Sequence, residues 1–202
     1  MNGKFFDLKK EKQDRMINAA LKVFAQHGYR RASTDDIVKE AGISKGLLFH
    51  YFESKIGVYN FVYDYSVRYV SLELKTAVNS KETNLFEILR QMEMGKMMAM
   101  RGYPYMQQFL NEAMYEDVSE ALLSIEQKRT ELTTLYEQLL AQADLSLLPA
   151  SVDASKVIQM LDYTIKGLMT SRFQDASFQP EMLYEEIKGY INLVEKMVGS
   201  CE

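Results

Sequence analysis

One stretch limits the fold more than any other feature of the chain. It is STDDIVKEAGISKGLLFHYFESK, residues 33–55, in which residues that start helices alternate with residues that end them. Ser33 or Thr34 can cap a helix, and the two aspartates that follow complement the dipole of a helix N-terminus. Gly42 ends that helix, because glycine tolerates the backbone angles of a tight turn, and Ser44 can cap the next helix. Two short helices joined by a tight turn that contains glycine form a helix-turn-helix.

The rest of the chain is also patterned as helices. Apolar residues recur three and four positions apart and predict further helices at 10–27, 54–78, 84–100, 105–115, 118–143, 153–173 and 180–198. Only three prolines and ten glycines interrupt 202 residues, and no β-alternation of useful length is found. The sequence therefore predicts an all-α fold with roughly nine helices.

The composition excludes several classes of protein. Cys201 is the only cysteine, so an intramolecular disulfide is impossible, which fits a reducing compartment. The N-terminal lysines are not followed by the apolar stretch of a secretory signal, and no run approaches the length of a membrane span. We therefore expect a cytoplasmic protein with no membrane partner.

Charge is distributed unevenly along the chain. Residues 1–60 hold 11 Lys and Arg against 7 Asp and Glu, whereas the remaining residues hold 13 against 21. A basic N-terminal part on an acidic body favours contact with a polyanion through the N-terminal part alone.

The second helix of the helix-turn-helix has two unlike faces. Leu48 and Phe52 are four residues apart and can face the core. Lys45, Phe49 and His50 lie on another side and can face outwards. An outward face that bears phenylalanine and histidine is unusual for a solvated surface, so we interpret it as a surface that meets a partner.

Residues 10–62 resemble the N-terminal domain of the tetracycline-repressor (TetR) family of bacterial transcription regulators. The resemblance rests on RMINAALKVFAQHGYRRAST, DIVKEAGISKGLLFHYFESK and VYNFV. The family pattern is Phe-x-x-x-Gly at the end of the first helix, a threonine before the second and Ala-Gly-x-Ser at the turn. An aromatic group before Ser-Lys completes it.

The resemblance implies a division of labour. Residues 1–53 would be the helix-turn-helix DNA-binding domain, and residues 54–202 a helical domain for effector binding and dimerisation. The chain would then be a ligand-responsive regulator, expected to be a repressor. It would bind an inverted-repeat operator in double-stranded DNA as a homodimer and would be released by a small, largely hydrophobic effector.

The family motif assigns DNA contacts to Thr34, Ser44, Lys45, Gly46, Leu47, Phe49, His50, Tyr51 and Lys55. Several have a second interpretation. Thr34 and Ser44 can act as N-caps, and Lys45 can reach a guanine edge or a phosphate, or remain solvated. Leu47 and Phe49 replace the threonine and tyrosine that are frequent in the family, so each loses a hydroxyl. Tyr51 can instead be part of the core.

Methionines and aromatic residues crowd into the region around residues 92–115. Methionine lines adaptable apolar pockets, so we expect an effector pocket here, although core packing is the simpler explanation for any single residue. The predicted ligand-binding residues are Met97, Met98, Tyr103, Met106, Phe109, Glu112 and Asp162. The apolar residues of the last two helices are expected either in a dimer interface or in the core: Val157, Met160, Leu161, Ile165, Leu168, Leu183, Ile187, Ile191 and Val194.

The sequence also bears on two other functions. An all-α enzyme is disfavoured, because the chain has no Gly-x-Ser-x-Gly, no phosphate-binding loop and no cluster of metal ligands. We therefore expect no enzymatic activity, no cofactor and no metal. A helical protein-interaction module without DNA binding is the remaining alternative, and the positive balance of the N-terminal part argues against it.

Overall fold

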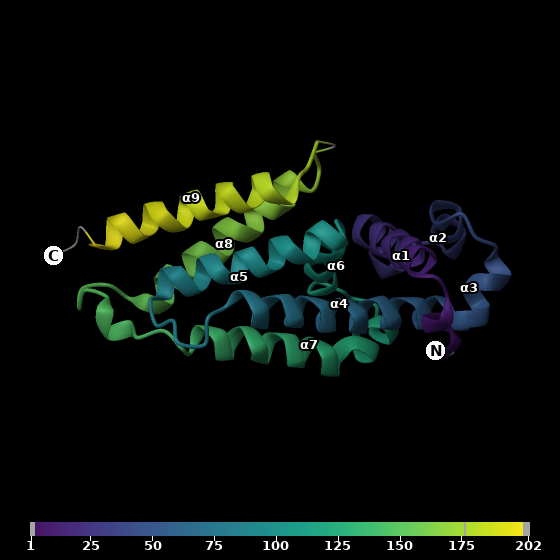
Figure 1. Ribbon diagram of the computed structural model, residues 1–202, viewed down its shortest axis with the longest axis horizontal. Coiled ribbons are helices and arrows are strands. Elements are labelled where there is room, and N and C mark those ends of the chain that lie inside the picture. The colour runs from purple at the N-terminus through teal and green to yellow at the C-terminus, as the bar shows by residue number, and fades with distance from the viewer. Residues whose placement is uncertain (1–2, 176, 200–202) are drawn as a thin grey trace. The chain divides into compact units, whose positions relative to one another are not determined.

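A computed structural model describes residues 3–175 and 177–199, and Cys201 lies outside these residues. The described residues form nine α-helices and two short 3-10 helices, with no strand, which confirms the predicted fold class (Figure 1). The elements are η1 (Gly3–Asp7), α1 (Lys10–Arg31), α2 (Thr34–Ala41), α3 (Lys45–Phe52), α4 (Lys55–Ala77), α5 (Leu85–Gly102), α6 (Met106–Ala113), α7 (Ser119–Leu140), η2 (Leu145–Leu147), α8 (Ala154–Arg172) and α9 (Pro180–Gly199).

The chain divides into two compact units. The head unit comprises residues 1–69 and 102–133, and the body unit comprises residues 70–101 and 134–202. Helices α4 and α7 contribute residues to both units, and α5 contributes its last residue, Gly102, to the head unit. The predicted boundary after residue 53 is a functional division, and it stays a prediction.

Aromatic rings hold the head unit together. Phe24 of α1, Tyr59 of α4 and Phe109 of α6 meet with ring centroids 5.0–6.1 Å apart. All three side chains are at most 1% exposed. The edge-to-face geometry of the Phe24–Tyr59 and Tyr59–Phe109 pairs is the arrangement that the ring quadrupole favours, so these contacts fix the helices in orientation as well as in distance.

Gly28 interrupts α1 near its C-terminal end. Its φ of 64° and ψ of 174° leave the helical region, and the amide of Ala32 donates to its carbonyl at 3.2 Å. Glycine adopts a positive φ without steric cost, which explains the predicted stop at this position.

The body unit has an aliphatic and methionine core. Its buried members are Leu85, Phe86, Leu89, Met100, Val157, Leu161, Ile165, Met169, Leu183, Ile187, Ile191, Val194 and Val198. This set includes most residues that the sequence left open between core and dimer interface, and Leu168 is partly buried against it. Only Met160 of that group is strongly exposed, at 47%. The core alternative therefore holds for most of them.

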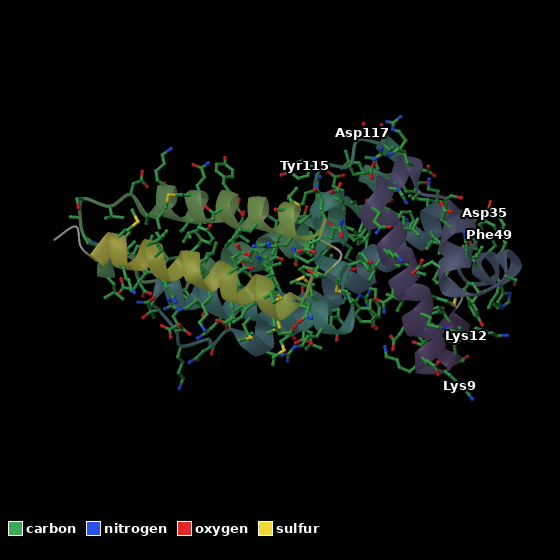
Figure 2. The ribbon with its side chains drawn as sticks, turned by 90° about the horizontal axis from the view of Figure 1, so that it is seen from above. Lys9, Lys12, Asp35, Phe49, Tyr115 and Asp117 are labelled. Carbon is green, nitrogen blue, oxygen red and sulfur yellow. The ribbon has the colours of Figure 1, made fainter. Side chains whose placement is uncertain are left out.

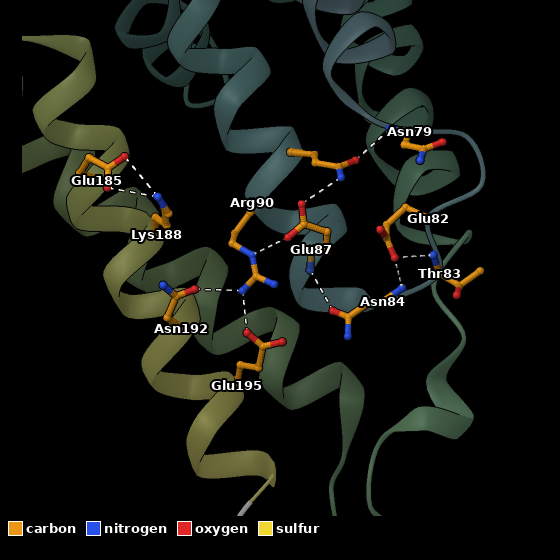
Figure 3. A network of polar contacts seen from close by, with 11 residues as sticks. Asn79, Glu82, Thr83, Asn84, Glu87, Arg90, Glu185, Lys188, Asn192 and Glu195 are labelled. Atoms are coloured by element: carbon orange, nitrogen blue, oxygen red, sulfur yellow. Dashed lines mark hydrogen bonds and ion pairs between the residues drawn. The ribbon is translucent and has the colours of Figure 1, made fainter.

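Arg90 connects α5 to α9 within the body unit through one ion pair and one hydrogen bond (Figure 3). The guanidinium of Arg90 donates to Glu87 at 2.8 Å, to Asn192 at 2.9 Å and to Glu195 at 2.6 Å. Its side chain is only 17% exposed, so the bonds form in a partly dehydrated site, where charge-assisted bonds are stronger than in water. This network sets the position of α9 along α5.

A second ion pair is more deeply buried. Lys96 contacts Glu93 at 2.6 Å, and their side chains are 15% and 5% exposed. The Lys96 ammonium also lies 5.3 Å from the centroid of the Tyr136 ring.

No helix in the described part of the chain is both long enough and apolar enough to cross a membrane.

Candidate nucleic-acid interface

The geometry of α2 follows from its capping residues. The Ser33 hydroxyl accepts a hydrogen bond from the Asp35 amide at 3.1 Å. At the other end, Gly42 has φ 63° and ψ 41°, and the Ile43 amide donates to the Val38 carbonyl at 3.0 Å. A left-handed glycine followed by this bond is a common way to end a helix, and it turns the chain sharply into α3.

Helix α3 has one buried side and one exposed side. The Ser44 hydroxyl caps it by accepting from the Leu47 amide at 3.2 Å. Leu48 and Phe52 are 1% and 4% exposed, as predicted for the core. The opposite side presents six of the predicted DNA-contacting residues. Leu47 and Phe49 are half-buried. The other four are exposed: Ser44, Lys45, Gly46 and His50.

Gly46 is not required by the protein's own packing. A β-carbon built on Gly46 meets no heavy atom within 4 Å. Alanine is more favourable than glycine in helices by about 1 kcal/mol, so the fold alone would favour a larger residue here. An exposed glycine on α3 lets another molecule approach the backbone closely.

Tyr51 lies in the core rather than on the exposed side. It is 7% exposed, and its ring lies 5.6 Å from Phe5 and 4.9 Å from His50, both edge-to-face. The core alternative given for Tyr51 therefore describes its ring, and a DNA contact through its hydroxyl stays a prediction. Thr34 is half-buried at the first position of α2, whose N-cap is Ser33.

Two predicted DNA-contacting lysines have partners inside the protein. Lys45 forms an ion pair with Asp35 at 2.8 Å. Lys55 donates to the Arg30 carbonyl at 3.3 Å, and its ammonium lies 4.5 Å from the centroid of the Tyr29 ring. Burial lowers the pKa of Lys55, and the charges of nearby glutamates oppose that shift.

An acidic turn between α6 and α7 contacts the C-terminal end of α1. The Tyr29 amide donates to Glu116 at 3.3 Å, and the Tyr29 hydroxyl donates to Glu120 at 3.1 Å. Arg30 forms an ion pair with Asp117 at 3.3 Å, which Figure 2 places beside the end of α1. Burial, together with the Glu120 carboxylate, raises the pKa of Tyr29 to about 12. These carboxylates thus act on Arg30 and Lys55, two cations of the head unit.

Two structurally important residues of the head unit were missed from the sequence. Phe5 is 0% exposed and packs against the end of α3, although sequence patterns gave no helix before residue 10. A β-carbon on Gly57 would lie 1.9 Å from the Phe52 carbonyl oxygen, so the corner between α3 and α4 depends on glycine. The hydrophobic pair Phe5–Phe6 was the one available signal for the first of these.

The corner also contains a backbone outlier. Glu53 has φ 67° and ψ −43°, a region that non-glycine residues rarely occupy, and its amide donates to the Phe49 carbonyl at 2.9 Å. Such conformations persist only where the surrounding structure enforces them. The end of α3 is therefore closely determined by its neighbours.

The seven predicted ligand-binding residues are divided between the units. Met97, Met98 and Asp162 belong to the body unit, and the others belong to the head unit. Met98 and Asp162 are exposed, as is Glu112, and Asp162 pairs with Lys166 at 2.7 Å. The ligand-binding role of the whole set stays a prediction.

The buried members of this set already have partners inside the protein. Met97, Met106 and Phe109 are at most 4% exposed. The Tyr103 hydroxyl donates to Asp14 and lies 2.6 Å from the Tyr65 hydroxyl. Each of these residues therefore contributes to packing or hydrogen bonding within its own unit, whatever else it binds.

Comparison with known proteins identifies the motif. Residues 16–60 match the family described as "Bacterial regulatory proteins, tetR family". Among curated proteins, the uncharacterized HTH-type transcriptional regulator YuxN of Bacillus subtilis is 41% identical over 78 residues, which are 37% of this chain and 26% of that protein. The HTH-type transcriptional activator FasR of Mycolicibacterium smegmatis is 39% identical over 49 residues, which are 24% of this chain and 22% of FasR. The chain thus spans only about a quarter of the length of these relatives.

A solved structure extends the likeness to the whole fold. A TetR family transcriptional regulator from Chloroflexus aurantiacus is similar with a TM-score of 0.67 and 23% identity, over 96% of this chain and 94% of that one. At this level of identity the likeness establishes the arrangement of helices, an N-terminal helix-turn-helix followed by a helical domain.

Proposed function

Because residues 16–60 match the tetR family of bacterial regulatory proteins, we propose that this chain is a member of it, a DNA-binding transcriptional regulator that reads its operator with α3. The observation that carries the proposal is the division of α3 into a buried side and an exposed side. The exposed side offers one cation, one imidazole and a glycine within a single helical turn and a half. A helix of this kind fits the major groove, where its first residues contact base edges.

The proposed DNA contacts fall into two groups. Lys45, Gly46, Leu47 and Phe49 would meet base edges and sugars, whereas Thr34, Ser44, His50, Tyr51 and Lys55 would meet phosphates. Two capped helix N-termini, at Ser33 and Ser44, present amide groups that also favour phosphate. Residues 1–53 would be the DNA-binding domain in this proposal.

The proposed oligomer is a homodimer formed by α8 and α9. Both helices bury one side in the body unit and still expose large apolar side chains on another: Met160, Tyr163, Met182, Tyr190, Leu193 and Met197, at 41–66% exposure. Exposed apolar groups concentrated on two neighbouring helices are typical of an interface between copies. A twofold dimer would bind an inverted repeat, with one head on each half-site.

We further propose that a small, largely hydrophobic effector releases the protein from DNA, that the protein acts as a repressor in the cytoplasm, and that it has no enzymatic activity. Residues 54–202 would bind the effector. Coupling of about 1–3 kcal/mol between effector and DNA is enough for such a response. The sign of regulation is tested by a reporter gene placed behind the operator, because repression and activation change its expression in opposite directions.

The test of DNA recognition is a pull-down of sheared genomic DNA with purified protein, followed by sequencing. We expect enrichment of one or a few inverted repeats, which is lost in a Lys45→Ala, His50→Ala double variant. Lys75→Ala removes an exposed lysine near the end of α4 and serves as the control that keeps enrichment. Capture of a partner protein without any enriched DNA would favour the interaction-module alternative instead.

Gly46→Ala separates folding from recognition. With open space around its β-carbon, alanine is expected to raise the free energy of unfolding by up to about 1 kcal/mol. The same methyl group would hold α3 away from the base edges, so operator affinity should fall. Unchanged affinity in a stabilised variant would remove Gly46 from the proposed reading surface.

Salt dependence tests the phosphate contacts. With four or five phosphates per head, the logarithm of affinity should fall against the logarithm of salt concentration with a slope of about −7 to −9 for the dimer. A slope much shallower than this would contradict the phosphate assignments while leaving the base contacts open.

A further inference from the structure

The N-terminal segment is folded onto the end of the proposed reading helix. Residues Gly3–Asp7 form the 3-10 helix η1, and Phe5 within it is 0% exposed. Its ring centroid lies 5.6 Å from that of Tyr51, 5.2 Å from Phe52 and 4.9 Å from Phe61. Phe5 therefore contacts the last turn of α3 and the side of α4 together, and Figure 1 shows the N-terminal segment at this corner.

Backbone and side-chain bonds hold this segment in place. The Gln13 amide group donates to the carbonyls of Phe6 at 3.1 Å and Leu8 at 2.7 Å, and Gln13 is 8% exposed. The Leu8 amide donates to the Phe5 carbonyl at 3.2 Å. A buried amide bonded to two carbonyls fixes the segment on α1, since leaving those groups unpaired would cost free energy.

The end of α3 depends on such outside support. The helix has only eight residues, and isolated helices shorter than about 12 residues are marginal in water. It ends at Glu53 with a positive φ, and Gly57 of α4 approaches so closely that its β-carbon would lie 1.9 Å from the Phe52 carbonyl oxygen. Ring packing on one side and a glycine contact on the other thus define a single corner.

We propose that Phe5 is a positioning residue for DNA recognition, a wedge between α3 and α4 that sets the orientation of the reading helix without touching DNA. The proposal rests on the proposed function of α3. It differs from an N-terminal arm that enters a groove, because an arm acts through its exposed groups. Phe6 is the exposed neighbour, at 53%, and provides the matched comparison.

The test compares Phe5→Ala with Phe6→Ala and Phe5→Leu. Affinity is measured for the operator found by the pull-down and, separately, for random-sequence DNA. Loss of orientation should lower the ratio of operator to random affinity about 10- to 100-fold in Phe5→Ala, comparable to the loss of one good base contact. Binding to random DNA depends on phosphates and should stay within about twofold. Phe6→Ala should leave the ratio of operator to random affinity unchanged, and Phe5→Leu should retain most of the wild-type ratio.

A second measurement tests, without DNA, whether Phe5 stabilises the end of α3. Amide hydrogen exchange of residues 48–53 should accelerate at least about tenfold in Phe5→Ala, while α1 and α6 amides change less, because local opening is independent of the global transition. Gly57→Ala tests the same corner without removing a ring and should accelerate the same amides. Phe86→Ala, a buried ring of the body unit, controls for general loss of stability and should leave the affinity ratio unchanged.

The outcomes are distinguishable. Equal losses in Phe5→Ala and Phe6→Ala would replace the wedge by a DNA-contacting arm, and an unchanged ratio in Phe5→Ala would overturn positioning altogether. If the wild-type protein shows no preference for any DNA sequence, the proposed function fails. Faster exchange of residues 48–53 would then still support Phe5 as the support of α3, and unchanged exchange would overturn it.

Discussion

The head unit and the body unit are held together by different kinds of side chain. In the head unit, rings from η1, α1, α3, α4 and α6 contact one another, as in the groups Phe5–Phe52–Phe61 and Phe24–Tyr59–Phe109. In the body unit, leucine, isoleucine, valine and methionine form the core, and the Arg90 and Lys96 ion pairs connect residues of its helices.

This difference fits two different tasks. An aromatic ring has few torsions and a directional quadrupole, so a cluster of rings fixes angles between helices. A methionine and aliphatic core adapts more readily, because several packings have similar free energies. A reading helix, as proposed for α3, must be held at one orientation, whereas a domain that binds an effector, as proposed for residues 54–202, must accommodate a ligand and a changed arrangement. The contrast between the units is testable by substitutions in each unit.

The largest expected effect is the loss of a head-unit ring. Phe109→Ala removes a side chain that is 1% exposed and contacts Phe24, Tyr59 and Tyr63, so it should lower the free energy of unfolding by about 3–5 kcal/mol. In the body unit, Met100→Leu keeps the volume and should cost less than about 1.5 kcal/mol. Urea denaturation measures both.

Phe109 was also a predicted ligand-binding residue, and the same variant separates the two roles. A large loss of stability assigns the ring to the core of the head unit. Unchanged stability together with an altered effector response would instead assign it to the pocket, and would break the contrast between the units.

The next effect concerns the buried ion pair of the body unit. Lys96→Met leaves the Glu93 carboxylate, 5% exposed, without its cation and should cost about 2–4 kcal/mol, allowing for the partial exposure of Lys96. The double variant Glu93→Leu, Lys96→Met removes both charges and should recover most of that loss. Thermal unfolding of the three proteins gives the comparison. A double variant no more stable than the single one would show that the pair stabilises the body unit outright.

The helix-turn-helix of the head unit was predictable for a local reason. Capping at Ser44 and turning at Gly42 depend on a few neighbouring residues, so the sequence predicted α2, α3 and the exposed side of α3 correctly. The helices of the body unit were also predicted, because periodicity reports them directly.

What the sequence left open depends on contacts between distant residues. The burial of Phe5 requires partners at positions 51, 52 and 61, and the need for Gly57 arises only from the approach of the Phe52 carbonyl. Periodicity likewise could not tell which apolar side of α8 and α9 lies in the core and which is exposed. Side-chain competition, such as Asp35 holding Lys45, is invisible without the fold.

Loss of a helix cap should lower the free energy of unfolding equally in the two units, but it should weaken operator binding only in the head unit. Ser44→Ala removes the bond to the Leu47 amide in the head unit, and Asp153→Ala removes the bonds to the Ser155 and Lys156 amides in the body unit. Each should lower the free energy of unfolding by about 1 kcal/mol. Only Ser44→Ala should weaken operator binding as well, since its helix N-terminus is a proposed phosphate site. Equal effects on DNA affinity would argue against α3 as the reading helix.

The smallest expected effect tests whether the acidic turn restrains the head unit. Asp117→Asn releases Arg30 from an ion pair in which both side chains are strongly exposed, at 75% and 68%. Exposed pairs are worth about 0–1 kcal/mol, so operator affinity should rise by at most about fivefold for each head. The gain should be largest at low salt, because the freed guanidinium acts on phosphates through a screened charge.

Asp162→Asn is the matched control, because it also removes one carboxylate from an exposed ion pair, that with Lys166 in the body unit. If net charge alone governs operator affinity, both variants should gain affinity to the same extent. If Asp117 competes with phosphate for Arg30, only Asp117→Asn should bind more tightly, and its salt slope should steepen by about one contact per head. Weaker binding by Asp117→Asn would mean that the ion pair holds the end of α1 in its DNA-binding position, so that the turn supports recognition rather than opposing it.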